Sequence, residues 1–362
     1  MTEPRKRSGC LGCSFPVLII IVVVFLGIVV IGFLAGGIGQ KMFPGVSLPS
    51  WLIVPRPEPH LPAPQLFHLF GLPITNSMLA GWLTLVFLVV IGWAVTRRMK
   101  LIPGRLQAAF EFLLGWIYDL CKSIAGEENG RRFFPVVCTI FLFVLFNAWL
   151  SLIPGFGSIE TIKYEGIPPE AQISVVPAEG NQPEHKVVMV DDKEHEIVLI
   201  NGEEVMEIKE ELIRGANTDV NTPLAIAFFS FVFVAFFGLK TLGMGWLKQY
   251  FNFGPFFRSI GRTFKGKFNL MDIFSGGIGI FVGGLEFLSM FIRVISFTFR
   301  LFGNMTAGEI LLLIAAFLVP WVMALPFYGL ELLIGFIQAL IFSLLTLVFV
   351  TMAVTSHSEE AH

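Results

Sequence analysis

Long apolar runs separated by short polar stretches dominate the chain. A run of about 18 apolar residues or more is long enough to cross a bilayer as a helix. The runs are continuous rather than alternating, which favours helices over a β-barrel. The pattern predicts spans over about 15–35, 77–95, 133–152, 223–239, 273–317 and 321–354. We therefore expect an all-α integral membrane protein with about six transmembrane helices.

The last two apolar runs are longer than a simple crossing requires. As one helix, the run 273–317 would measure roughly 65 Å, at about 1.5 Å per residue, whereas a perpendicular crossing needs only ~30 Å. Either the helices are broken or they are steeply tilted. Pro320 and Pro326 lie between the two runs, so a hairpin turning near Pro320 is predicted. Candidate break points within the first run are Gly276, Gly277, Gly283 and Gly284.

A further helix is predicted between the second and third spans, over about 104–126. Its apolar residues recur at helical spacing, whereas its polar residues fall elsewhere on the helical wheel. Such an amphipathic helix is typical of segments that lie at the membrane surface. The predicted apolar face consists of Leu106, Phe110, Leu113, Leu114, Ile117 and Leu120.

One clearly polar segment, Gly155 to Asn221, separates the third and fourth spans. It carries fifteen of the 27 acidic residues of the chain and only five basic ones. The stretches "KVVMV", "EIVLI" and "VMEIK" have the composition of short strands, and "DDKEH" and "NGEE" between them are typical of turns. We expect a small acidic β-rich insertion that folds outside the membrane and takes no part in ion transfer.

Basic residues near the span ends predict the orientation, because Lys and Arg accumulate in cytoplasmic loops. With six crossings, both termini are expected inside and the acidic insertion outside. The first run has a basic start like that of a cleaved signal peptide, but its length favours a retained anchor. The residues expected at the cytoplasmic side are Arg5 to Arg7, Arg97 to Lys100, Arg131, Arg132 and the basic loop Lys240 to Lys267.

The pattern predicts six segments along the chain. These are a membrane anchor (1–37), a Pro-rich extracytoplasmic connector (38–75), two transmembrane helices flanking the amphipathic helix (76–154), the acidic insertion (155–221), a transmembrane helix with a basic loop (222–272) and a final helical hairpin (273–362).

Composition agrees with a membrane protein and excludes several function classes. The chain is 55% hydrophobic and 14% charged, with a net charge of −2. Cys10 and Cys13 have the spacing of half a metal site, but a closed zinc site needs four ligands. They are more simply juxtamembrane cysteines, which are frequent lipidation sites. The sequence has no nucleotide-binding loop and no nucleophile–base constellation. We therefore predict no catalytic site, cofactor, metal or nucleic-acid partner.

Polar residues form a stripe inside the run 273–317. Ionisable groups in a bilayer are costly and usually face protein or water. At about 100° per residue, the stripe residues fall within about 40° of Arg300, and Glu309 lies nearly opposite. The next helix carries Glu331 and Gln338 on one face, seven residues apart. The stripe consists of Glu286, Arg293, Ser296, Arg300 and Asn304.

The hairpin at Pro320 aligns these groups in depth. It places Arg300 level with Gln338, and Glu309 level with Glu331. Arg300 and Glu309 cannot both face the seam, so two faces must be used. Arg300 could be a structural arginine paired with Glu286 or Glu331. The number of polar groups at this depth favours a transport path instead.

The stretches around these residues resemble subunit a of the rotary F-type ATP synthases. They are "RLFGNMTAGE", "GFIQALIFSLLTLVFVTMAV", "FNAWLSLIPGF" and "TDVNTPLAIA". The similarity extends from about Asn76 to Val354. The amino-terminal anchor and the acidic insertion depart from the common bacterial pattern, and several relatives have histidine in place of Glu331.

The resemblance implies a stator subunit of a bacterial plasma membrane. Its last two helices would press against a rotating c-subunit ring. Its further partners would be the b-subunit peripheral stalk, the catalytic head through the complex, and lipids. Arg300 would face each ring carboxylate, favour its ionised form and block leakage between two half-channels. Glu309 and Glu331 would line the outer half-channel, with Asn304 and Gln338 positioning Arg300 and waters. Glu286 and Ser296 would belong to the cytoplasmic side.

Two other function classes remain open from sequence. A secondary ion-coupled transporter is one, although such folds tend to show inverted repeats and none is visible here. A structural anchor that presents the acidic insertion is the other, but it would not explain Arg300 within an apolar run. Copurification of a c-ring would discriminate among the three.

Overall fold

The computed structural model describes most of the chain, and its helices account for the apolar runs. Six helices are long and apolar enough to cross a membrane. The described residues are 15–43, 45, 48–49, 52–53, 63–69, 71–97, 99–153, 160–167, 172–176, 185–190, 193–200, 203–250, 270–320 and 323–355. The long helices are α1 (Phe15–Ala35), α3 (Asn76–Thr96), α4 (Arg105–Ser151), α5 (Asn221–Leu242), α8 (Leu270–Leu318) and α9 (Ala324–Val354), and the short ones are α2 (Gly37–Met42) and α6 (Met244–Tyr250).

The predicted spans are confirmed to within a few residues at their ends. Thr75 caps the amino terminus of α3, since its hydroxyl accepts a hydrogen bond from the amide of Met78. The turn between the last two helices follows Leu318, and α9 begins at Ala324, so the hairpin near Pro320 is also confirmed. The chain is therefore an all-α, multi-pass membrane protein.

Helix α4 joins the predicted amphipathic helix and the third span with a sharp turn. Gly126 has φ 79° and ψ 173°, which is not helical and suits glycine because it has no Cβ. Two helical parts thus meet at Gly126. The first part packs one face on the bundle, with Ile117 and Cys121 buried. Leu106 was expected on that face, but it is 74% exposed.

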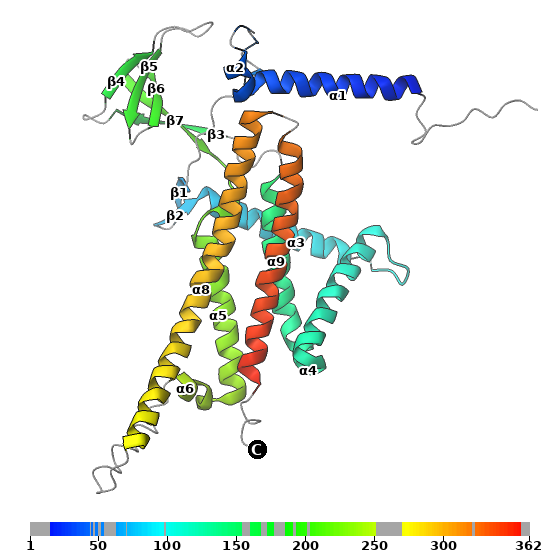
Figure 1. The fold of residues 1–362 in the computed structure, drawn as a ribbon, viewed down its shortest axis with the longest axis vertical. Coiled ribbons are helices and arrows are strands. Elements are labelled where there is room, and N and C mark those ends of the chain that lie inside the picture. The colour runs from blue at the N-terminus through cyan, green and yellow to red at the C-terminus, as the bar shows by residue number, and fades with distance from the viewer. Residues whose placement is uncertain are drawn as a thin grey trace, which may run out of the picture.

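Helices α8 and α9 are continuous, so tilt rather than breakage accounts for their length. The 49 residues of α8 correspond to about 73 Å at roughly 1.5 Å per residue. Figure 1 shows α8 and α9 crossing α3 at a steep angle, with α1 lying across the end of the α8–α9 hairpin. A helix so much longer than the ~30 Å hydrocarbon core must lie oblique to the membrane normal.

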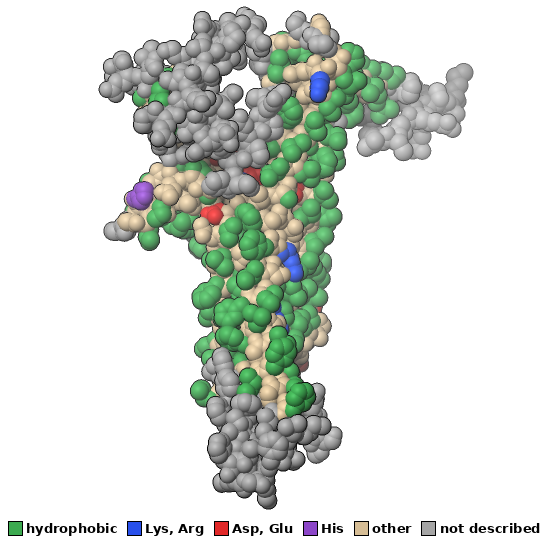
Figure 2. All heavy atoms as spheres, turned by 60° about the vertical axis from the view of Figure 1, so that its left-hand side comes forward, with side chains coloured by type: hydrophobic (Ala, Val, Ile, Leu, Met, Phe, Trp, Pro, Cys, Tyr) green, Lys and Arg blue, Asp and Glu red, His purple; other side chains and the backbone are tan. Residues whose placement is uncertain are grey.

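The core lies where α4, α5, α8 and α9 run alongside one another (Figure 1). Aromatic rings fill it: Phe297 of α8 packs against Phe342 of α9 with centroids 4.8 Å apart. Gly335 of α9 lies so close to Ala148 of α4 that a Cβ there would meet the alanine methyl at 2.8 Å. In the view of Figure 2, the surface of the long helical body is largely hydrophobic, with isolated charged side chains.

The polar segment between α4 and α5 contains five antiparallel strands in the order β3-β7-β6-β5-β4. The three strands expected from sequence correspond to β5 (His185–Val190), β6 (Lys193–Ile200) and β7 (Glu203–Glu211), and β3 (Glu160–Gly166) and β4 (Gln172–Val176) add to them. Glu160 pairs with Glu211, so the segment leaves and rejoins the bundle at neighbouring points. A 3₁₀ turn, η2 (Ala216–Thr218), then leads into α5.

A small hairpin, β1 (Gln65–Leu69) and β2 (Leu72–Thr75), ends the connector before α3. It was not expected from the Pro-rich composition. Several expectations fall outside the described residues: Cys10 and Cys13, the basic start Arg5 to Arg7, Arg98, most of the connector, and the basic loop beyond Tyr250.

Candidate functional site

The α8–α9 seam brings the predicted polar residues together in nearly the expected register. Asn304 Nδ2 of α8 donates a hydrogen bond to Gln338 Oε1 of α9 at 2.9 Å. About one helical turn further on, the carboxylate of Glu331 lies directly against Gly308, where any Cβ would collide with it. Gln338 and Glu331 are buried, at 3% and 5% exposure. The predicted register, with Arg300 level with Gln338 and Glu309 level with Glu331, is therefore correct to within one helical turn.

Arg300 lies on α8 between Asn304, which contacts Gln338, and Glu286 at the amino-terminal end of the polar stripe. Its side chain is half-buried, and its guanidinium lies 5.9 Å from the ring centre of Phe297. Among the residues that the structure describes, no ion pair joins Arg300 to a carboxylate. The predicted alternative of an ion pair with Glu286 or Glu331 has no such contact in this part of the chain.

Glu309 faces away from the seam, as the helical wheel requires, and its partner was not foreseen. Nε of Arg214 lies 3.2 Å from both carboxylate oxygens of Glu309, and Nη2 lies 2.9 Å from Oε2. Arg214 comes from the segment between β7 and η2, inside the predicted insertion 155–221. The predicted insertion 155–221 therefore includes a residue that contacts the candidate site. The isolated arginine in an acidic segment was the available signal.

Buried amides line the junction of α3, α4 and η2, next to Arg214. Asn147 of α4 accepts a hydrogen bond from Thr84 at 2.8 Å, and Asn76 of α3 donates one to the carbonyl of Glu211 at 3.0 Å. At this junction, atoms of three buried amides have no hydrogen-bond partner among the described residues. These are Asn76, Asn147 and Asn217. Sequence reasoning assigned them no role, although Asn147 is conspicuous within an apolar span.

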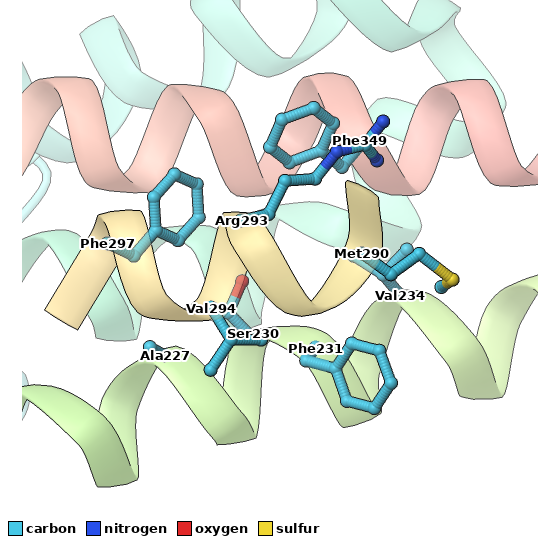
Figure 3. A pocket seen from close by; sticks show the side chains of 9 residues that line it. All are labelled: Ala227, Ser230, Phe231, Val234, Met290, Arg293, Val294, Phe297 and Phe349. Atoms are coloured by element: carbon cyan, nitrogen blue, oxygen red, sulfur yellow. The ribbon is translucent and has the colours of Figure 1, made fainter. Parts of the chain in front are cut away.

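At the opposite end of the stripe, Arg293 stacks on α9. Its guanidinium lies 4.2 Å from the ring centre of Phe349 (Figure 3). Both residues line a cavity of about 30 Å³ between α5, α8 and α9. Ser230 of α5 also lines this cavity, and its hydroxyl lies 2.7 Å from that of Thr346.

Glu286 lies two turns further along α8 and faces α6. Burial raises the pKa of the Tyr250 hydroxyl above its ordinary value, and the charge of Glu286 adds to the rise. Glu286 is half-buried and Ser296 is exposed. No described contact links Glu286 to Ser296, so the structure does not bring these two predicted residues together.

The arrangement supplies ionisable groups and amides rather than bond-breaking chemistry. Within the described part of the chain, no group of three or more His, Cys, Asp or Glu side chains could hold a metal ion. Ionisable side chains such as these carboxylates, placed inside a membrane, are typical of ion pathways and proton relays.

Comparison with known proteins agrees with the geometry. The sequence model of the family "ATP synthase A chain" matches residues 78–351. The chain is 28% identical over 281 residues to ATP synthase subunit a 3 of Pelobacter propionicus, covering 78% of this chain and 86% of that protein. It is 28% identical over 275 residues to ATP synthase subunit a of a Geobacter species, covering 76% and 86%. A similar relative from Gloeobacter violaceus shares 28% identity over 288 residues, covering 78% and 85%.

The matched region runs from α3 into α9 and includes the α8–α9 hairpin with its polar contacts. Members of this family are membrane-sector subunits without a catalytic site of their own. The chain therefore belongs to the ATP synthase A chain family, the subunit a family of the F-type ATP synthases.

Proposed function

We propose that this chain is the stator that provides two ion half-channels beside a c-subunit ring and couples proton flow to rotation. The observation that carries the proposal is Arg300. It is half-buried on a membrane helix, and no described carboxylate pairs with it. An arginine in that position is costly unless a counter-charge reaches it. A carboxylate presented in turn by each subunit of a ring supplies such a charge.

Arg300 suits this role because its guanidinium stays protonated at any physiological pH. A ring carboxylate that passes it must release its proton, because the adjacent positive charge favours the ionised form. The fixed charge also repels a proton that would cross directly from one half-channel to the other. Arg300 therefore separates the two paths.

The outer half-channel would run along the buried polar groups near η2. The buried amides of Asn76, Asn147 and Asn217 lie on α3, α4 and η2, which contact one another, and η2 also contacts α8, the helix of Glu309. Their hydrogen-bonding atoms without protein partners are suited to water. The Asn304–Gln338 hydrogen bond lies along the hairpin between Arg300 and the carboxylates of Glu309 and Glu331, where it can orient Arg300 and water.

The inner half-channel would begin at the opposite end of α8. Glu286 is an acidic group on that part of α8, and Ser296 lies between it and Arg300 on the same helix. The cavity between α5, α8 and α9 is lined mainly by apolar side chains, and Arg293 and Ser230 are its polar lining residues (Figure 3). With this orientation both termini and the end of α3 face the cytoplasm, in a bacterial plasma membrane. The b-subunit stalk and the catalytic head complete the set of partners.

The test is ATP-driven proton pumping in inverted membrane vesicles. Arg300→Ala should abolish pumping while the subunit still inserts. Arg300→Lys should also fail, because an ammonium lacks the planar fork and loses its proton more readily when buried. Arg132→Ala is the matched control, since Arg132 is 61% exposed in a surface pair with Glu128. Pumping near the wild-type rate in Arg300→Ala would refute the proposal.

A secondary transporter is the remaining alternative. A tag on this chain should copurify a c-ring from solubilised membranes if the stator proposal holds. Ion transport by the purified chain alone would favour the transporter.

A further inference from the structure

Among the described residues near the site, Arg214 is a strongly buried charged side chain to which the proposed half-channels assign no role. We propose that Arg214 is a positioning residue that holds the carboxylate of Glu309, and that it makes the end of the strand-rich segment part of the outer half-channel. This inference rests on the proposed function and assigns a role to a residue outside the polar stripe.

The contact has the geometry of a specific ion pair. Two nitrogens of Arg214 reach both oxygens of Glu309, at 2.9 to 3.2 Å. Paired contacts of this kind fix the plane of a carboxylate as well as its position. Arg214 is only 5% exposed, whereas the side chain of Glu309 is 25% exposed. Arg214 therefore contacts the buried side of the Glu309 carboxylate, and part of this carboxylate remains accessible.

The backbone around Arg214 is itself anchored to the bundle. The carbonyl of Glu211 accepts the hydrogen bond from Asn76, and Asp219 accepts one from Ser77 at 2.9 Å. Both donors lie at the start of α3. Gly215 packs against Ser151 at the end of α4. The segment 211–219 is thus tied to α3 and α4, which fixes the backbone position from which the Arg214 side chain extends.

The charges around the pair support positioning rather than simple packing. The carboxylate of Glu211 also approaches Arg214 Nε, at 3.9 Å. Arg214 therefore lies between two carboxylates from different elements. Removing the charge of Arg214 would leave the partly buried carboxylate of Glu309 without its partner. The loss in free energy is larger than for a surface ion pair. Glu309 would then rotate towards water or towards other donors.

The experiment uses complete complexes in inverted vesicles and compares four substitutions. Arg214→Gln removes the positive charge. Arg214→Lys keeps the charge but lacks the planar guanidinium that contacts both carboxylate oxygens. Glu309→Gln removes the negative charge of the partner. The double variant Arg214→Gln/Glu309→Gln leaves neither charge unpaired. Arg132→Gln is the control, because it breaks an exposed pair worth little. Pumping rate and the amount of c-ring copurified with the tagged chain are measured for each.

Arg214→Gln is expected to lower pumping about tenfold, since a misplaced group of about 1 Å can cost that much or more. Arg214→Lys should recover a substantial part of the rate. The double variant should pump no more slowly than Glu309→Gln alone, because the arginine acts through Glu309. If Arg214→Gln fails to assemble, the double variant should assemble better.

Three results would overturn the inference. One is wild-type pumping by Arg214→Gln. Another is an additive loss in the double variant, which would mean that Arg214 acts independently of Glu309. The third is failure of assembly to the same extent in Arg214→Gln and in the double variant Arg214→Gln/Glu309→Gln. The Arg300→Ala vesicles separate the two proposals. If they pump, the half-channel function itself is wrong. If they do not pump and one of the three results above is found, only the role of Arg214 fails.

Discussion

The carboxylate of Glu331 on α9 lies directly against Gly308 on α8. A buried carboxylate can approach a helix backbone this closely only where the facing residue has no side chain. Gly308 therefore makes room for Glu331, and its neighbour Glu309 turns to Arg214 on the other face of α8. The two carboxylates occupy one level of the hairpin but separate surroundings.

Replacing Gly308 by alanine should displace Glu331. The added Cβ would overlap the carboxylate, so ATP-driven pumping should fall by at least about tenfold. Gly92→Ala is the control, because a Cβ at Gly92 on α3 meets nothing within 4 Å. Wild-type pumping by Gly308→Ala, with Gly92→Ala also unchanged, would show that the position of Glu331 is unimportant.

The Asn304–Gln338 hydrogen bond should act as a unit. Gln338→Leu leaves Asn304 without its acceptor, and Asn304→Leu leaves the buried amide of Gln338 without its donor. Each change should slow pumping several-fold, and the double variant should be no slower than the worse single variant. Proton pumping in inverted vesicles measures this. Additive losses would mean that the two side chains serve separate purposes.

Cysteine labelling tests the outer path. In a background that lacks Cys10, Cys13, Cys121 and Cys138, cysteine at position 309 or 331 should react with a small thiol reagent added to the outer side. Position 309 should react faster, because the Glu309 side chain is 25% exposed and Glu331 only 5%.

Cysteine at position 350 is the control for this labelling, because Val350 is fully buried in the core. It should remain unlabelled. Failure of both positions 309 and 331 to react from the outer side, with the cytoplasmic side reactive, would contradict the assigned orientation of the path.

The strand-rich segment should be dispensable apart from its base. Thr161 and Glu210 are cross-strand partners, so their Cα atoms are only about 5 Å apart. Replacing residues 162–209 by a short Gly/Ser linker should leave ATP synthesis within about threefold of wild type, since long surface insertions are tolerated. The same replacement combined with Arg214→Gln should lose far more. Loss of synthesis by the linker alone in an assembled complex would place the strands themselves in the ion path.

Local pattern accounts for most of the helices because each span satisfies its own backbone hydrogen bonds and meets apolar surroundings along its length. That is why α1, α3, α5 and the α8–α9 hairpin follow the apolar runs closely. The break between the helix predicted over about 104–126 and the third span falls at Gly126, where the positive φ suits glycine.

The sequence by itself determined the membrane class, the helices and the polar stripe, since 3.6-residue periodicity fixes which side chains share a face. It also placed Glu309 opposite Arg300. Only the tertiary structure decided what Glu309 faces. Arg214 is 95 residues away along the chain, and its position depends on hydrogen bonds from α3 to the segment after β7. Contacts between distant segments depend on how whole elements pack, and no local periodicity records them.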